Sequence, residues 1–123
     1  MYELTVKIDE DGPLASGVQY SNGGGNLVVT GYDDVIEEIR FVRHPDQKDF
    51  WKFVDFRSVV RSGPATIGGK PVIELVAVED HLITVRDRLG EYGRYKYTIE
   101  IESSKKYVSD PEIQNRRDVG TGG

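Results

Sequence analysis

Residues 95–102 of the chain read YKYTIEIE and alternate between apolar or aromatic and polar side chains at every position. One face would carry Tyr95, Tyr97, Ile99 and Ile101, and the other would carry Lys96, Thr98, Glu100 and Glu102. A period of two residues is typical of a β-strand with one face in the core and the other in solvent. Residues 2–8 (YELTVKI) repeat the pattern, so the sequence predicts a half-buried strand near each end of the chain.

Between these segments, clusters of turn residues divide the chain into further short strands. Strands are expected at residues 17–20, 27–30, 50–60, 72–78, 81–87 and 107–108. Residues 50–60 hold the densest aromatic cluster, so we expect them to supply the middle of the core. Residues 72–78 (VIELVAV) are apolar on both faces, which predicts a central strand. Residues 35–43 (VIEEIRFVR) fit a helical stripe as well as a strand, and their β surroundings favour a strand.

The composition agrees with a β fold. The chain has thirty Val, Ile and Thr residues against nine Ala and Leu, a bias that suits pleated sheet better than helix. Its 123 residues fit one domain that can bury about two thirds of its unfolded surface. The sequence therefore predicts an all-β fold, a two-sheet antiparallel β-sandwich of seven to nine short strands, cupredoxin- or immunoglobulin-like, over residues 1–115. Residues 116–123 (RRDVGTGG) offer little to bury and predict a flexible C-terminal tail.

The charge distribution argues against nucleic acid as a partner. The net charge is −5, and residues 1–38 carry eight acidic residues against one basic residue. Residues 94–97 (RYKY) interleave bases and aromatics as single-strand nucleic-acid binders do. Strand alternation, however, puts Tyr95 and Tyr97 on the core side and the two cations on the other. We therefore expect no nucleic-acid partner.

Cytoplasm is the expected compartment. No apolar stretch approaches the ~20 residues needed to span a bilayer, and the first residues (MYELTVKIDEDG) lack the pattern of a signal peptide, so no membrane contact is predicted. The chain has no cysteine, which agrees with a reducing compartment and excludes a disulfide, a thiolate metal site and a cysteine nucleophile.

Few residues are suited to catalysis or metal binding. A metal could join His44 and His81 with Asp46 or Asp80, but no ligand spacing supports such a site, and two unrelated surface histidines are favoured. The glycine-rich stretches 23–25 and 68–69 lack the spacing of phosphate-binding loops. The sequence predicts no catalytic residue, no cofactor and no metal, and hence a protein that is not an enzyme.

The stretch 92–115 carries a more specific pattern, a tyrosine-rich strand followed by a turn and the segment DPEIQN with Asp110, Pro111, Ile113 and Asn115. It resembles the C-terminal part of small bacterial domains that have a cupredoxin-like β-sandwich and end in a D-P-x-I-x-N segment. The resemblance implies that fold and no established activity. Because the thiolate ligand of true cupredoxins is missing, it implies no copper or redox chemistry. Pro111 would stop the last strand, and Ile113 would tuck under the sandwich edge.

A second resemblance is confined to the tail, which ends in Gly122 and Gly123. It is similar to the tails of ubiquitin-like modifiers and sulfur-carrier proteins, which an adenylating enzyme threads through a narrow channel. The resemblance implies conjugation through Gly123 by an activating and conjugating enzyme system. Such a modifier would have an α+β fold containing a β-grasp, with a long helix after the first hairpin, and residues 33–43 offer only a short candidate.

The sequence favours a non-enzymatic domain that binds a protein partner or assembles with itself. Exposed strand edges, the acidic first third and the tail are the expected contact surfaces. The alternative is a ubiquitin-like modifier conjugated through Gly122 and Gly123. A third hypothesis, a sandwich that binds a small ligand or sugar near Trp51, requires that this side chain be exposed.

Overall fold

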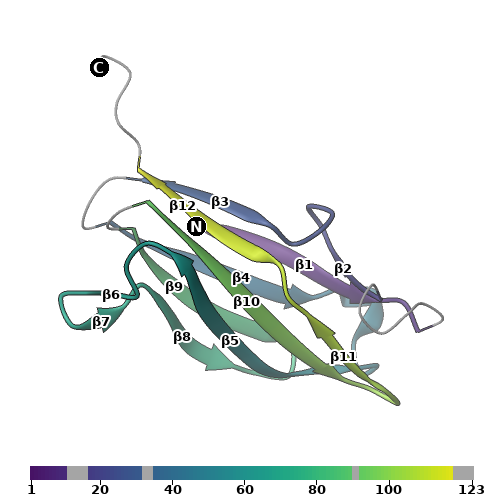
Figure 1. Ribbon diagram of the computed structural model, residues 1–123. Coiled ribbons are helices and arrows are strands. Elements are labelled where there is room, and N and C mark those ends of the chain that lie inside the picture. The colour runs from purple at the N-terminus through teal and green to yellow at the C-terminus, as the bar shows by residue number, and fades with distance from the viewer. Residues whose placement is uncertain (11–16, 32–34, 90–91, 118–123) are drawn as a thin grey trace.

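A computed structural model of the chain describes residues 1–10, 17–31, 35–89 and 92–117, which form two packed five-stranded β-sheets and a separate two-stranded hairpin (Figure 1). The strands are β1 (Tyr2–Ile8), β2 (Val18–Tyr20), β3 (Leu27–Gly31), β4 (Val35–Arg43), β5 (Lys52–Ser62), β6 (Thr66–Ile67), β7 (Lys70–Pro71), β8 (Ile73–Val78), β9 (Leu82–Leu89), β10 (Gly93–Glu102), β11 (Lys106–Ser109) and β12 (Glu112–Arg117). A 3-10 helix, η1 (Pro45–Gln47), follows β4. The all-β sandwich predicted from the sequence is confirmed, and so is a strand over the described residues 35–43.

The first sheet has the strand order β2-β1-β4-β9-β8. In the second sheet β5 runs along one edge of β10, while β11 and β12 pair with the C-terminal and N-terminal halves of β10, and β3 lies beside β12. Because a strand has only two edges, β11 and β12 share the second edge of β10. Pro111 lies between them and cannot donate to a ladder, which separates the two strands.

Two details of the predicted sandwich are wrong. The described residues contain twelve strands rather than seven to nine, partly because β11 and β12 are separate and because Gly68 and Gly69, both at positive φ, close the short β6–β7 hairpin. The sheets are also not wholly antiparallel, since β1 pairs with β4 and β3 with β12 in parallel. Each of these parallel pairs joins strands that are distant in sequence, which local alternation cannot indicate.

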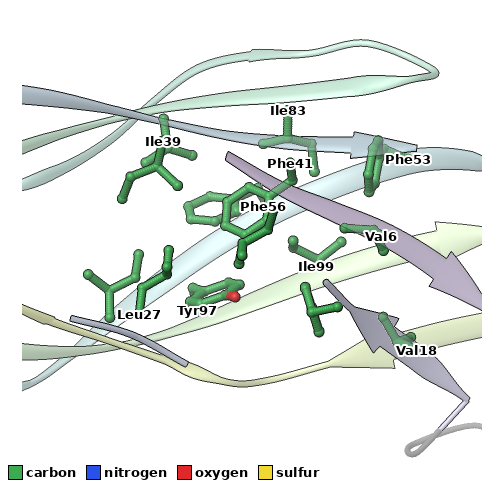
Figure 2. Close-up of a cluster of buried hydrophobic side chains, with 14 of the residues drawn as sticks. Val6, Val18, Leu27, Ile39, Phe41, Phe53, Phe56, Ile83, Tyr97 and Ile99 are labelled. Carbon is green, nitrogen blue, oxygen red and sulfur yellow. The ribbon is translucent and has the colours of Figure 1, made fainter. Parts of the chain in front are cut away.

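Aliphatic and aromatic side chains fill the space between the sheets (Figure 2). Phe41 of the first sheet lies 5.1 Å, centroid to centroid, from Tyr97 of the second, and Phe56 of β5 stacks on Tyr97 at 5.7 Å. The Tyr97 hydroxyl donates a hydrogen bond to the carbonyl oxygen of Gly25. Gly25 has φ +84°, and a Cβ there would lie 2.7 Å from the Tyr20 ring and 3.0 Å from Pro111 Cγ, so only glycine fits at this position.

The predicted central position of β8 is wrong, because β8 pairs only with β9 among the described residues and is an edge strand. The prediction that residues 50–60 supply the core is confirmed for Trp51, Phe53 and Phe56, which are 3–4% exposed. The other residues of β5 are mostly exposed, since β5 is also an edge strand and pairs only with β10 in the described part of the chain. An apolar run fits an edge strand as well as a central one, because hydrophobicity alone does not say how many strands flank it.

The C-terminal strand extends beyond the predicted domain boundary. Arg116 and Arg117, assigned above to the tail, continue β12 and pair with Thr30 and Gly31 of β3. Residues 118–123 lie outside the described residues. In the part of the chain that the structure describes, no helix has the length and apolar character needed to cross a membrane.

Candidate interaction surface

Exposed apolar side chains gather on the two edge strands β5 and β8. The structure has eleven exposed large hydrophobic side chains among its described residues, and five of them belong to these two strands: Val54, Val59 and Val60 on β5, and Leu75 and Val76 on β8. The strands lie side by side along one side of the sandwich (Figure 1). We call these five residues the edge patch.

The register shows that part of the edge patch faces the interior. Val60 lies opposite Tyr95, and Leu75 lies opposite Val85. Both partners are fully buried, at 1% and 0% exposure, whereas Val60 is 38% and Leu75 is 42% exposed. Residues opposite each other share a face of the sheet. The sandwich is therefore open along this side, and apolar side chains that point toward its interior remain in contact with water.

Charged residues of both signs accompany the edge patch. On β5, Arg57 Nε lies 3.1 Å from Asp55 Oδ2, and both side chains are well exposed. Lys52 Nζ lies 3.9 Å from Glu102 Oε1 of β10. Exposed pairs of this kind contribute little to stability, about 0–1 kcal/mol. They remain available to charges of the opposite sign on another molecule.

Neither histidine is part of a group that could hold a metal ion within the described residues. His44 caps η1, its Nδ1 accepting a hydrogen bond of 3.0 Å from the Asp46 backbone N–H, and its side chain lines an open depression of about 440 Å³ together with Lys7 and Tyr20. His81 is exposed in the turn between β8 and β9. In the described ranges, no three His, Asp or Glu side chains are grouped so that they could hold a metal ion.

Trp51 is a core residue rather than a ligand platform. It is only 3% exposed, and its indole N–H donates to Gln47 Oε1 at 2.6 Å. The ring packs edge-on against Phe53 with centroids 4.8 Å apart. The exposure that the small-ligand hypothesis required is therefore absent at this side chain.

The basic residues of β10 are occupied by ion pairs. Tyr95 and Tyr97 are buried, as strand alternation predicted, while Arg94 and Lys96 face outward. Arg94 donates to both carboxylate oxygens of Glu112, at 2.7 and 3.1 Å, and Lys96 Nζ lies 3.4 Å from Asp110. Neither cation is left without a carboxylate neighbour, so this strand presents no excess of positive charge.

Two acidic side chains of the N-terminal third are likewise paired. Glu37 contacts the terminal amine of Met1 at 3.0 Å, and Glu38 contacts Arg40 at 2.7 Å. Asp11, Asp33 and Asp34 lie outside the described residues.

A polar pair that the sequence analysis missed lies between the sheets. Asp87 on β9 and Asn115 on β12 are both 0% exposed, and Asn115 Nδ2 donates to Asp87 Oδ1 at 2.6 Å. Burial raises the pKa of Asp87 to about 7; the hydrogen bond from Asn115 opposes this rise, and the negative charge of Glu37 adds to it. Asp87 Oδ2 and Asn115 Oδ1 have no hydrogen-bond partner. The pair is buried in the core and does not line the depression beside His44.

Among the described residues directly opposite this pair on the neighbouring strands, Glu37 is the one with a charged side chain. Asp87 lies opposite Glu37 of β4 and Ile73 of β8, while Asn115 lies opposite Gly93 of β10 and Val29 of β3. Both orphaned oxygens are acceptors, so a proton carried by Asp87 would satisfy the two together. The site therefore favours the neutral carboxylic acid.

Gly122 and Gly123 lie outside the described residues, so the structure places neither glycine. The described residues contain no α-helix, and the alternative α+β fold with a β-grasp is therefore not their architecture. Comparison with models of known protein families gives no match, and no curated protein matches the chain.

Proposed function

We propose that the protein is a non-enzymatic interaction or assembly domain that binds through the edge patch and the free edge of β5. The observation that carries the proposal is the exposure of the patch, with Val59 66% and Leu75 42% in contact with solvent. Natural sheets usually protect such edges, because free N–H and C=O groups beside apolar side chains recruit another strand. Binding by strand addition would use both features at once.

The proposal also agrees with the positions of two described residues whose side-chain types often serve in catalysis. His44 uses its Nδ1 to cap η1, and the one strongly perturbed carboxyl, Asp87, has no contact with solvent. The proposal places the protein in the cytoplasm, because its sequence contains no cysteine.

Site-specific photo-crosslinking tests the proposal. A photoreactive amino acid replaces Val59 in the edge patch or, as the matched control, Ile36, which is 54% exposed on the outer face of β4. We expect protein adducts at position 59 and few at position 36, in the purified protein at high concentration or in cells that express it. Equal yields at the two positions, together with a monomer in light scattering, would refute the proposal.

A lysine at position 59 supplies the second measurement. Val59→Lys places a charge where a partner strand must pack, so association should weaken while the free energy of unfolding changes by less than about 0.5 kcal/mol. If Val59→Lys unfolds the protein instead, Val59 has a structural role in the monomer and the argument from exposure fails.

A further inference from the structure

The free edge of β5 is long. Phe53 N–H donates to the Asp80 carbonyl oxygen at 3.0 Å, and beyond it residues 54–62 pair only with β10 in the described part of the chain. Nine residues span about 30 Å at ~3.3 Å per residue, which exceeds the usual strand of about five or six. Two register shifts, at Val54 and Arg61, bound a regular stretch of residues 55–60.

Several devices that protect edge strands are missing here. Residues 54–62 contain neither proline nor lysine, and the bulges lie only at the two ends of the stretch. Three of the five edge-patch residues belong to it. The segment can therefore accept an antiparallel strand along the regular stretch of residues 55–60, between the two bulges, and the question is which strand complements it.

We infer that the occupant is β5 of a second copy of this chain, paired antiparallel with Ser58 opposite Ser58. The inference deepens the proposed function and rests on it. A two-fold axis at Ser58 pairs residues 56–60 of the two copies, all within the regular stretch, and places Phe56 opposite Val60. Asp55 of each copy then lies beside the bulge at Arg61 of the other, so opposite charges flank the paired stretch at both ends.

Charge and length exclude the neighbouring symmetric registers. An axis at Arg57 would place two guanidinium groups opposite each other, and an axis at Val59 would place Arg57 opposite Arg61; like charges directly opposite are destabilising. An axis at Phe56 would place residues 59–62 opposite residues 50–53, although the Phe53 N–H is already bonded to the β8–β9 turn. Only the axis at Ser58 pairs residues of the regular stretch without like charges opposite each other and brings Asp55 near Arg61.

A cysteine scan of β5 reads the register directly, because the natural chain has no cysteine. Directly opposed residues of antiparallel strands have Cα atoms about 4.5–5.5 Å apart, a separation that a disulfide can bridge, whereas residues two positions away are too far. Ser58→Cys should form a disulfide-linked dimer on mild oxidation. Arg57→Cys and Val59→Cys should each stay monomeric alone and crosslink at least about tenfold more when mixed in equal amounts.

Charge reversal provides an independent test without new covalent bonds. Asp55→Arg and Arg61→Asp should each weaken dimerisation in sedimentation equilibrium about tenfold, because each creates two like-charge contacts in a symmetric dimer. The double variant Asp55→Arg/Arg61→Asp restores opposite charges and should recover affinity to within about threefold. The matched control reverses the exposed Glu38–Arg40 pair on β4 and should leave dimerisation unchanged.

The outcomes separate this inference from the proposed function. Self-crosslinking of Arg57→Cys or Val59→Cys would show a different register and overturn the inference alone. Adducts at position 59 with another protein, while Ser58→Cys gives no dimer, would also overturn the inference and leave the interaction function standing. Absence of every adduct at position 59 would overturn both.

Discussion

Replacement of Asp87 by asparagine should raise the stability of the protein at neutral and alkaline pH and leave it nearly unchanged in acid. The side chain is 0% exposed, and burial raises its pKa to about 7. In the unfolded chain an aspartate has a pKa of about 3.9. Between these two values the folded protein holds one proton more than the unfolded chain. Its free energy of unfolding therefore falls as pH rises through this window.

The size of the effect follows from the two pKa values. Each pH unit in the window costs about 1.4 kcal/mol, so the loss between pH 4 and pH 7 is about 4 kcal/mol, after which Asp87 contributes no further change. An asparagine at position 87 keeps the shape, carries no charge and can donate its amide N–H to the free Oδ1 of Asn115. At pH 8 Asp87→Asn should therefore be more stable than the natural protein by up to about 4 kcal/mol.

Urea unfolding at a series of pH values measures this difference. The single tryptophan, Trp51, is 3% exposed, so its fluorescence reports loss of the core. Free energies extrapolated to water at pH 4.5, 5.5, 6.5, 7.5 and 8.5 give one curve for each variant. The difference between Asp87→Asn and the natural protein should grow across the series at about 1.4 kcal/mol per unit and level off above pH 7.

A constant difference across the series would refute the reasoning, since a purely structural effect of the substitution does not depend on pH. Asp80→Asn is the matched control, because Asp80 is an exposed aspartate at the β8–β9 turn. Its curve should run parallel to that of the natural protein. If Asp87→Asn kept the slope of the natural protein, as Asp80→Asn is expected to do, the titrating group would not be Asp87.

Three further predictions concern the interior and are measured by the same urea unfolding. Asn115→Asp places a second carboxyl beside Asp87, so this variant should be destabilised most at high pH and recover in acid; a pH-independent loss would contradict this. Phe41→Ala removes a fully buried ring and should cost about 3–5 kcal/mol, and a loss below 1 kcal/mol would show that the aromatic cluster is dispensable. Gly25→Ala forces a Cβ against the Tyr20 ring at positive φ and should cost about 1–3 kcal/mol, whereas no loss would mean that the turn rearranges.

The half-buried strands could be predicted because one face of each meets the core. Tyr95, Tyr97, Ile99 and Ile101 are 0–1% exposed, and their alternation was visible in the sequence. For residues 35–43 alternation alone was ambiguous, and the β surroundings favoured a strand; in the structure Ile39 and Phe41 of β4 are fully buried and Arg40 is not. Local periodicity reports which face of a strand is buried.

Periodicity does not report how many strands lie beside a given strand. Residues 72–78 are apolar enough for the middle of a sheet, yet β8 pairs only with β9, and Leu75 and Val76 are 42% and 44% exposed. The sheet order places β8 last, and that order depends on contacts between distant segments. A single sequence gives no information on such contacts.

The buried polar pair could be suspected from the sequence, because both residues occupy inward positions of predicted or observed strands. Asp87 follows Ile83 and Val85 at the inward positions of β9, and Asn115 follows Ile113 at an inward position of β12. Because buried polar groups are almost always hydrogen-bonded, a carboxylate and an amide at core positions of two strands indicate that each has a hydrogen-bond partner, or else that the strand assignment is wrong. That the two meet across 28 positions of sequence needed the structure.

The pair and the edge patch are opposite departures from the rule that polar groups face water and apolar groups face the core. Asp87 places an ionisable carboxyl in the core, where an uncharged group would be more stable, whereas Val59 exposes an apolar side chain to water, where a polar one would be more stable. Stability of the monomer explains neither residue, because Asp87→Asn should raise the free energy of unfolding and Val59→Lys should leave it almost unchanged. The two substitutions therefore test two separate regions. Asp87→Asn should change only the free energy of unfolding, because it lies between the sheets, and Val59→Lys should change only association, because it lies on the free edge of β5.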